Sequence, residues 1–241
     1  MSQPADLDAL VDSSSGAPRH GFQGDRGKTP DVRHAPLGLS IALSREAGSR
    51  GASIARRVGR QLGWQVYDQE LLEYMSQDIS AREGLVEGLP TACMEWIERR
   101  SETLEQTCGM DKRSPAYPLA QTILALAAQG EAVLIGRGAG CVLPRASTLN
   151  VRIIAPLPDR IAYMSQWLRL TTAEATERVT SRDARRAEFL RTHFARTPSE
   201  VHQYEMLLNS GELGEETCAE LIARAARLRW ETATDRGERG A

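Results

Sequence analysis

The chain has 241 residues and a mass of 26.5 kDa, enough for one sizeable α/β domain with its own core. Its 30 basic and 32 acidic side chains nearly balance, which argues against a general affinity for nucleic acid polymers or anionic membranes. Its four cysteines lack CxxC spacing, and we find neither a signal peptide nor an apolar run of membrane-spanning length. We therefore expect a soluble, cytoplasmic protein without a disulfide framework.

Both ends of the chain are polar. Residues 1–36 are rich in Ser, Gly, Pro, Asp and Arg, and residues 231–241 are also polar and contain Gly. Such segments bury too little apolar surface to offset the entropy lost on ordering. The sequence therefore predicts a disordered leader at 1–36, a folded domain at 37–230 and a disordered tail at 231–241.

Between these ends, short apolar segments alternate with longer helical patterns, which is typical of a parallel sheet covered by helices on both faces. The predicted strands are 39–43, 65–67, 132–135, 149–154 and 204–208. The predicted helices are 53–62, 69–78, 119–128, 158–168, 172–194 and 215–228. The strand at 149–154 is nearly all apolar, which indicates burial on both faces. Residues 80–115 are helical but less orderly, because Pro90 interrupts them, and we expect a small inserted lobe there.

The first loop of interest lies within residues 39–62, where an apolar strand leads through Gly and Ser into a helix. Backbone N–H groups of such a loop, together with the partial positive charge of the helix N-terminus, can hold phosphate oxygens without a side-chain cation. The candidate phosphate-binding residues are Gly48, Ser49, Arg50, Gly51, Ala52 and Ser53. The alternative is a plain strand-to-helix turn in which small residues only allow tightness.

Two side chains of this loop bear on its chemistry. The lysine of a Walker loop would fall at Gly51, yet the chain has no lysine between Lys28 and Lys112. Ser53 has a hydroxyl that can bind magnesium, or that can simply cap the helix. Whether the loop still holds a triphosphate is therefore the main question that the sequence raises.

A second Gly-rich loop, GRGAG at 136–140, follows the strand predicted at 132–135. It should lie at the carboxyl edge of the sheet, where ligands of such folds collect. Gly136 and Gly138 allow the backbone to approach a bound group, while the Arg137 guanidinium can fork onto a phosphate. Arg137 is therefore a candidate phosphate ligand. The alternative is a surface arginine paired with a carboxylate.

The helix at 172–194 is crowded with charge. Arg178, Arg182 and Arg186 share one face because they are four residues apart. Interleaved acidic residues make a solvated, salt-bridged helix the expectation from the pattern alone. A functional role requires this face to close over a phosphate, where arginines neutralise charge that develops during phosphoryl transfer.

Five segments in order resemble the cytidylate kinase-like family of P-loop nucleoside monophosphate kinases. They are SREAGSRG, GWQVYDQELL, LIGRGAGCVLP, RDARRAEFLRTHF and YEMLLNSGELGEETCAELI, and the resemblance runs from about residue 39 to residue 228. It implies a P-loop kinase fold: an α/β domain with a five-stranded parallel sheet flanked by helices. It also implies a small helical monophosphate-binding lobe and an arginine-bearing lid at 172–197.

The resemblance also implies a reaction, the transfer of the γ-phosphoryl group of ATP to CMP or dCMP with Mg²⁺ bridging the phosphates. Nucleotide substrates are then the expected partners, and a homodimer is left open. Residues 48–53 would hold the donor phosphates, with Ser53 at the metal. The implied acceptor contacts are Asp68, Arg137 and Asp183, and the implied catalytic arginines are Arg50, Arg182 and Arg186.

The chain departs from the family pattern at two places. Cytidylate kinases carry a Gly-Lys pair where this chain has Arg50 and Gly51, whereas the kinase-like branch often has Gly-Gly there. The acidic residue of their GRD loop is Gly138 here, which leaves the acceptor base open. Two hypotheses follow: a phosphotransferase acting on a nucleoside monophosphate or a related small phosphate acceptor, or a catalytically weak or inactive nucleotide-binding pseudokinase with a regulatory or scaffolding role.

Overall fold

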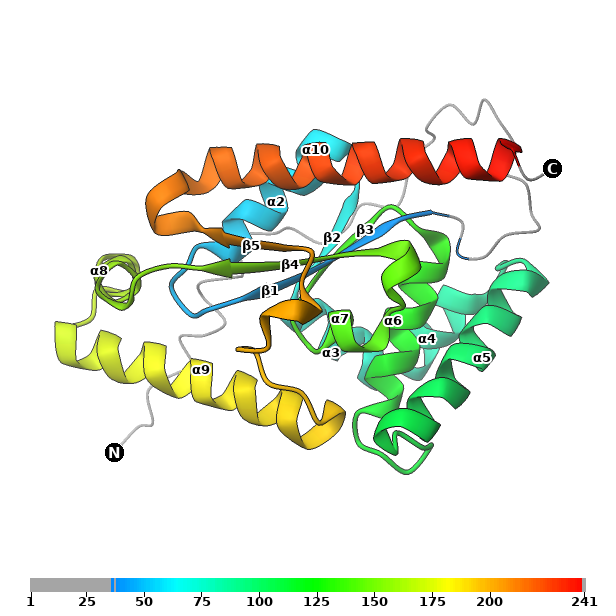
Figure 1. The fold of residues 1–241 in the computed structure, drawn as a ribbon. Coiled ribbons are helices and arrows are strands. Elements are labelled where there is room, and N and C mark those ends of the chain that lie inside the picture. The colour runs from blue at the N-terminus through cyan, green and yellow to red at the C-terminus, as the bar shows by residue number, and fades with distance from the viewer. Residues whose placement is uncertain (1–35, 37, 240–241) are drawn as a thin grey trace.

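A five-stranded, all-parallel sheet forms the centre of the computed structural model, which describes residue 36 and residues 38–239, with side chains up to residue 231. Its strand order is β2-β3-β1-β4-β5 (Figure 1). The strands are β1 (Ser40–Arg45), β2 (Gln65–Tyr67), β3 (Ala132–Ile135), β4 (Thr148–Ile154) and β5 (Met206–Asn209). The predicted α/β class with a five-stranded parallel sheet is confirmed.

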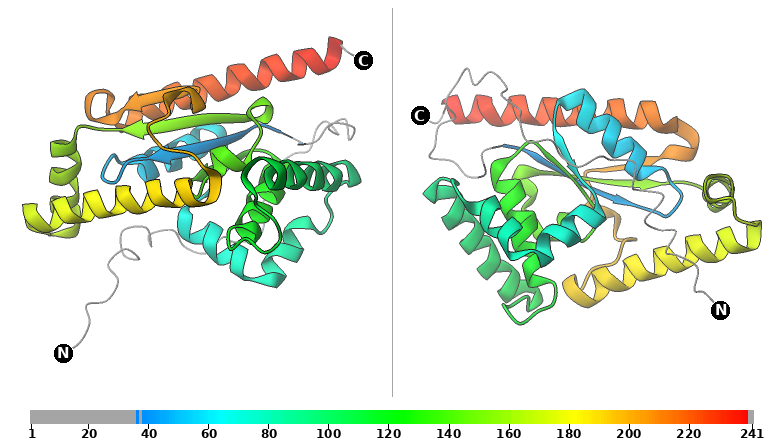
Figure 2. Two further views of the ribbon diagram at one scale, coloured as in Figure 1. Left: turned by 60° about the horizontal axis from the view of Figure 1, so that its bottom comes forward. Right: turned by 180° about the vertical axis from the view of Figure 1, so that it is seen from behind.

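Helices cover both faces of this sheet (Figures 1 and 2). On one face lie α2 (Gly51–Leu62) and α10 (Ser210–Arg239), and on the other lie α3 (Gln69–Gln77), α4 (Ile79–Val86), α5 (Thr91–Cys108), α6 (Tyr117–Gln129) and the short α7 (Ala139–Val142). Two further helices, α8 (Leu157–Leu168) and α9 (Thr172–Phe194), follow β4 in the chain and pack against each other. Short 3-10 turns occupy Arg145–Ser147 (η1) and Val201–Gln203 (η2).

The strand order creates a switch point beside the central strand. After β1 the chain moves to β2 on one side, whereas after β3 it crosses to β4 on the other side of β1. Ligands of open parallel sheets bind at the carboxyl ends of strands where the connections diverge in this way. The loops that follow β1 and β3, which are the two Gly-rich loops of the sequence, both emerge there.

Strand β4 is largely buried on both faces, as expected, but its two faces differ in character. Leu149, Val151 and Ile153 pack into the apolar cluster beneath α2 and α10. The alternate residues Asn150 and Arg152 point to the opposite side of the sheet and line a cavity instead. One face of this strand is therefore core and the other is a polar cavity wall.

The segment expected to form an inserted lobe folds as α4 and α5. Cys93, Ile97 and Leu104 of α5 are buried in the same apolar cluster as helix α6, so this segment shares its core with the rest of the domain. Arg100 ties α5 to the chain after β3, because its Nε donates to the Val142 carbonyl oxygen at 2.7 Å. The position of α5 is therefore set by its packing against the main domain.

The last helix is longer than expected. It continues to Arg239, beyond residue 228, where the sequence predicted its end, and through most of the segment 231–241 that was expected to be a disordered tail. Trp230 packs partly buried against the cluster beneath α10, and most of the residues that follow favour helix. The predicted leader lies outside the described residues apart from residue 36. Within the described part of the chain, every helix is too short or too polar to cross a membrane.

Candidate active site

The loop between β1 and α2 has a backbone that only particular residues tolerate. Gly48 has φ +80°, and a Cβ built there would lie 2.6 Å from the Arg160 carbonyl oxygen, so a side chain does not fit. Arg50 is left-handed, with φ 58°, and accepts the first bond of α2 from the N–H of Ile54 at 3.0 Å. The N–H groups of residues 51–53 precede that bond, so they lie at the positive end of the helix without an intrahelical partner.

Two other N–H groups of the loop already have protein acceptors. The N–H of Ala47 donates to Asp183 Oδ1 at 2.7 Å, and the N–H of Ser49 donates to the Glu46 carbonyl oxygen at 3.3 Å. The Ser49 hydroxyl is buried and donates to the same carbonyl at 2.9 Å. Ser49 was predicted to contact phosphate, but the structure turns it inward, and the available N–H groups lie further along, at residues 50–53.

A cavity of about 390 Å³, here called the loop cavity, lies over the N-terminus of α2. Its lining includes most of the predicted phosphate-binding residues together with side chains from α8, α9 and α10: Gly48, Arg50, Gly51, Ala52, Ser53, Tyr163, Trp167, Arg182, Arg185, Arg186 and Glu215. Trp167 is 57% exposed and its ring stacks on that of Tyr163, with centroids 6.0 Å apart. The loop cavity thus joins a helix N-terminus, arginines and an aromatic surface.

Ser53 does not cap its helix. Its hydroxyl donates to the carboxylate of Glu215 from α10, which also lies 3.9 Å from Arg50 Nε and 3.6 Å from Arg57 Nε. A hydroxyl and a carboxylate side by side form a donor set that suits Mg²⁺, which keeps several waters and takes its other ligands from phosphate oxygens. Glu215 could not be predicted as part of this site, because no motif in the sequence links residue 215 to residue 53.

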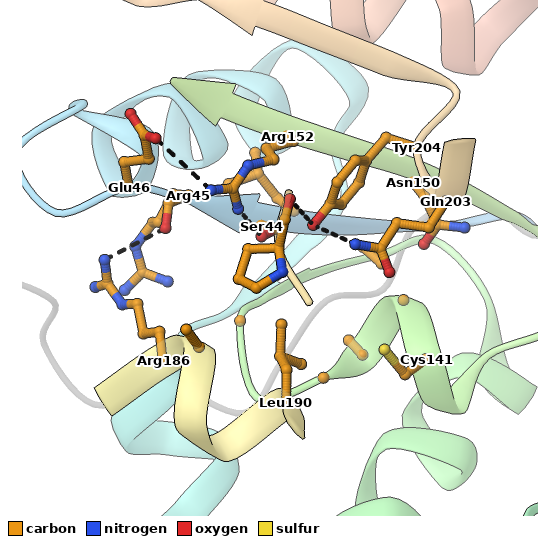
Figure 3. Close-up of a pocket in the computed structure, with 18 of the residues that line it drawn as sticks. Ser44, Arg45, Glu46, Cys141, Asn150, Arg152, Arg186, Leu190, Gln203 and Tyr204 are labelled. Atoms are coloured by element: carbon orange, nitrogen blue, oxygen red, sulfur yellow. Dashed lines mark hydrogen bonds and ion pairs between the residues drawn. The ribbon is translucent and has the colours of Figure 1, made fainter. Parts of the chain in front are cut away.

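A second cavity, of about 500 Å³, lies on the face of the sheet opposite α10 and is called here the sheet cavity (Figure 3). Its walls come from β1, β4, the loop after β3, helix α9 and the segment before β5. The lining residues include Ser44, Arg45, Glu46, Arg137, Cys141, Asn150, Arg152, Asp183, Arg186, Phe189, Leu190, Gln203 and Tyr204. Burial raises the pKa of the Cys141 thiol to about 11, so this thiol is neutral.

Five residues line both cavities and form what we call the junction: Arg45, Glu46, Gln69, Arg137 and Arg186. Three of the five are arginines from three different elements. Burial lowers the pKa of Arg137, and the neighbouring positive charges of Arg186 and Arg185 lower it further. Cations gathered in this way repel one another, and an anion placed between them relieves that repulsion.

Arg137 combines the two roles that the sequence left as alternatives. Its backbone is left-handed, with φ 50°, and the guanidinium forms an ion pair with Glu73 of α3. The same guanidinium lies over the Phe189 ring, 5.2 Å from its centroid, and lines both cavities. Carboxylate pairing therefore holds Arg137 at the junction without removing it from the cavities.

Helix α9 is more than a solvated, salt-bridged helix, which was the expectation from its pattern. Arg182, Arg185 and Arg186 face the loop cavity, whereas Arg178 is not among its lining residues. The helix is turned this way because Ala175 and Val179 pack with Met164 and Ala47 in a small core cluster. Helix α9, which the sequence predicted to be a lid, thus packs directly on the loop after β1.

Asp183 joins the lid to that loop. Its Oδ1 accepts the N–H of Ala47, and its Oδ2 accepts from Arg160 Nη1 at 2.5 Å. The Arg160 side chain is only 10% exposed, and Nη1 also donates to the Ala47 carbonyl oxygen at 3.1 Å. Asp183 was predicted to contact the acceptor; it lines the sheet cavity, and its carboxylate is also the main polar link between lid and loop.

Asp68 is not brought to either cavity. Its carboxylate caps α3 by accepting the N–H of Leu71 at 3.0 Å, and the neighbouring Gln69 lines both cavities instead. Sequence analysis also missed Glu46, whose carboxylate lies 3.4 Å from Arg160 Nε and 3.7 Å from Arg152 Nη2. The sequence contains one hint of the sheet cavity. Asn150 and Arg152, which line it, are polar residues in an otherwise apolar strand.

Comparison with known proteins agrees with this architecture. A family model described as the cytidylate kinase-like family matches residues 40–212. An uncharacterized protein from Eubacterium ventriosum aligns with a TM-score of 0.64 and 16% identity over 78% of this chain and 98% of that one. Shikimate kinase from Bacteroides thetaiotaomicron aligns with a TM-score of 0.41 and 14% identity over 78% and 97% of the two chains. A comparison with curated proteins finds no match.

The parallel sheet, with a glycine-bearing loop and a helix N-terminus after its central strand, defines a P-loop kinase fold. Within that class the chain belongs to the cytidylate kinase-like family, because the family model matches well over half of its length. The predicted family and fold are confirmed. At 16% identity, the structure from Eubacterium ventriosum bears on the fold alone.

Proposed function

We propose that this protein is a phosphotransferase that moves the γ-phosphoryl group of ATP to CMP, dCMP or a related small phosphate acceptor. The observation that carries the proposal is the junction, where Arg137 and Arg186 stand between two cavities of about 390 and 500 Å³. A donor in the loop cavity and an acceptor in the sheet cavity would meet at these guanidiniums. Family membership supports a kinase but does not identify the acceptor.

The donor phosphates would be held by the N–H groups of residues 50–53, at the positive end of α2, and by Arg182 of the lid. Arg50 lies over the Tyr163 ring at 4.9 Å and has its Nε 3.9 Å from Glu215, so its guanidinium lines the loop cavity from a fixed position. This arrangement supports donor binding without the Walker lysine. Mg²⁺ held by Ser53 and Glu215 would neutralise phosphate charge when bound.

In the proposed mechanism, catalysis comes from positioning and from charge neutralisation. An oxygen of the acceptor phosphate forms a bond to the γ-phosphorus as the bond to the ADP oxygen breaks. Arg137 would hold the acceptor phosphate, and Arg186 would balance the charge on the transferring group. Arg186 is held near the reacting centre because its Nη1 donates to the Arg45 carbonyl oxygen at 3.3 Å.

The alternative is an inactive nucleotide-binding protein with a regulatory or scaffolding role. It is favoured by the protein contacts that already occupy the site, namely the Asp183 carboxylate on the N–H of Ala47 and the Glu73 carboxylate on Arg137. In an active enzyme Arg137 would have to bind the acceptor phosphate beside the Glu73 carboxylate, whose negative charge opposes that binding. Turnover therefore separates the two functions.

The test is a coupled ADP-release assay with ATP, Mg²⁺ and a panel of nucleoside monophosphates. We expect turnover with at least one acceptor. Arg137→Ala should raise the KM for the acceptor at least tenfold, since hydrogen bonds to charged groups contribute about 1.5–3 kcal/mol, with little change in the KM for ATP. Arg99→Ala, an exposed change on α5, should alter neither value. ATP binding without turnover on any acceptor would favour the pseudokinase, and equal effects of Arg137→Ala on both KM values would contradict its assigned role.

A further inference from the structure

Asn150 is a buried polar residue whose side chain has no partner in the described protein. It is 2% exposed, and both its Oδ1 and its Nδ2 are without a hydrogen bond. Its backbone is fully engaged, because its N–H donates to Glu205 Oε2 at 2.7 Å and its carbonyl accepts the N–H of Glu205 at 2.9 Å. An unpaired amide at this depth costs stability, so its presence calls for a partner that the protein alone does not provide.

The free amide belongs to the wall of the sheet cavity. It is packed closely, because a Cβ built on Gly140 of the second Gly-rich loop would lie 2.4 Å from Asn150 Oδ1. Because Gly140 has no Cβ, it leaves room for the amide, and the two backbone bonds to Glu205 hold the residue in place. A fixed, desolvated amide beside a cavity is a recognition group that is organised before its ligand arrives.

The position of Asn150 separates it from the arginines. Figure 3 shows Asn150, Gln203 and Tyr204 at one end of the sheet cavity and Arg45, Glu46 and Arg186 at the other. An acceptor whose phosphate lies at the junction would thus place its opposite end beside Asn150. That end must offer both a hydrogen-bond donor and an acceptor, because a neutral amide presents an accepting oxygen and a donating NH2 group.

Flat surfaces accompany the amide. The Tyr204 ring has the Arg152 guanidinium 5.7 Å from its centroid, and its hydroxyl accepts from Gln203 Nε2 at 2.9 Å. These contacts hold the ring at the cavity wall. Aromatic and guanidinium planes stack on nucleobases, and asparagine pairs with the donor and acceptor that lie side by side on a base edge.

We propose that Asn150 is the specificity-determining residue for the acceptor's nucleobase, its amide pairing with an adjacent donor and acceptor on the base edge. This inference rests on the proposed function, because it assumes that the acceptor phosphate lies at the junction. The sequence left the base preference open, because the acidic residue that follows Arg in the GRD loop of cytidylate kinases is Gly138 here. Phe194 packs where a side chain at Gly138 would lie, with a Cβ only 2.3 Å from the ring, so that position cannot supply the contact.

Calorimetric titration without ATP tests this assignment independently of turnover. The probes are CMP, UMP, AMP and GMP, each compared with ribose 5-phosphate, which carries the phosphate but no base. Wild type should bind its preferred nucleotide at least about tenfold more tightly than ribose 5-phosphate, the scale of one good bidentate contact. Asn150→Leu should reduce that ratio to within about twofold, leaving ribose 5-phosphate binding unchanged.

Thr148→Val is the matched control. Thr148 lies two residues earlier on the same face of β4, and its Oγ1 is likewise buried without a partner, yet it is not among the residues lining the sheet cavity. This variant should keep the full base preference. Asn150→Leu should also unfold at the same temperature as wild type or higher, because it removes an unsatisfied amide. Should Asn150→Leu fail to fold, Asn150→Asp, which keeps the shape and loses the donor, must show the same loss of preference.

The outcomes separate this inference from the proposed function. Base-dependent binding that Asn150→Leu abolishes, in a protein without turnover, would support the inference and refute the kinase. Turnover by wild type with an unchanged base preference in Asn150→Leu would refute the inference and leave the kinase standing. A wild-type protein that binds ribose 5-phosphate as tightly as every nucleotide would also overturn the role of Asn150.

Discussion

The link between lid and loop gives the sharpest test of how this site is held together. Asp183→Ala removes the acceptor for the N–H of Ala47 and for the Arg160 guanidinium, two bonds of 2.7 and 2.5 Å. The Asp183 and Arg160 side chains are 30% and 10% exposed, so solvent replaces these bonds poorly. The change should therefore lower the free energy of unfolding and loosen the loop.

The expected magnitude follows from the groups left behind. Hydrogen bonds to charged groups contribute about 1.5–3 kcal/mol, whereas a buried charge left without any partner costs about 3–5 kcal/mol. Arg160 keeps Glu46, whose carboxylate lies 3.4 Å from its Nε, so the lower range applies. We expect Asp183→Ala to cost about 2–3 kcal/mol and to raise the KM for ATP, because the loop N–H groups lose their fixed geometry.

Urea unfolding in a double-mutant cycle measures the pair itself. The cycle uses Asp183→Ala, Arg160→Met and the double variant, and we expect a coupling free energy above about 1 kcal/mol. The control cycle uses Arg191 and Glu188 of the same helix, which are paired at 2.6 Å but 66% and 58% exposed, and should give a coupling close to zero. If the Asp183–Arg160 coupling is no larger than that of the control pair, the assigned role of Asp183 is wrong.

Two further predictions concern Gly48 and Cys141. Gly48→Ala adds a Cβ 2.6 Å from the Arg160 carbonyl oxygen. The control is Gly63→Ala, since Gly63 also has a left-handed backbone but a Cβ there would meet no other atom within 4 Å. In urea unfolding, Gly48→Ala should be at least about 1 kcal/mol more destabilising than Gly63→Ala. Equal losses would refute the steric argument. Because burial raises the pKa of Cys141 to about 11, its neutral thiol should be alkylated at pH 8 roughly a hundredfold more slowly than a model thiol. The rate, followed by mass spectrometry, should rise with pH until about pH 11; rapid alkylation at pH 8 would contradict this environment.

The sequence determined much of the architecture because local patterns encode it. Strand β3, helix α9 and the order of alternating elements follow from apolar periodicity and from end signals, and the structure has both elements at their predicted bounds. The Gly-rich loops could be recognised directly, because Gly48 and Gly136 are glycines at positions whose backbone is left-handed. The family follows from five such segments in order, and residues 40–212 match it.

The composition of the site depends on contacts that sequence spacing does not reveal. Glu215 meets Ser53, Asp183 meets Ala47, and Arg160 is buried between loop and lid, across separations of up to 162 residues. For the same reason Ser49 and Asp68 looked like ligand contacts until their polar groups proved to be used within the protein. Local patterns specify elements, but the pairing of charges depends on which faces the packed helices present.

Asn150 also shows that a local pattern can mark a residue while packing decides its surroundings. In the sequence it is one polar residue in an apolar strand, and alternation alone cannot say whether its side faces core, solvent or a cavity. Only the packing of α9 and of the second Gly-rich loop over that face of the sheet makes this buried residue part of a cavity wall. The sequence by itself determined the kinase fold and its loops, while the tertiary structure decided which side chains reach the two cavities, because burial and charge pairing depend on elements far apart in the chain.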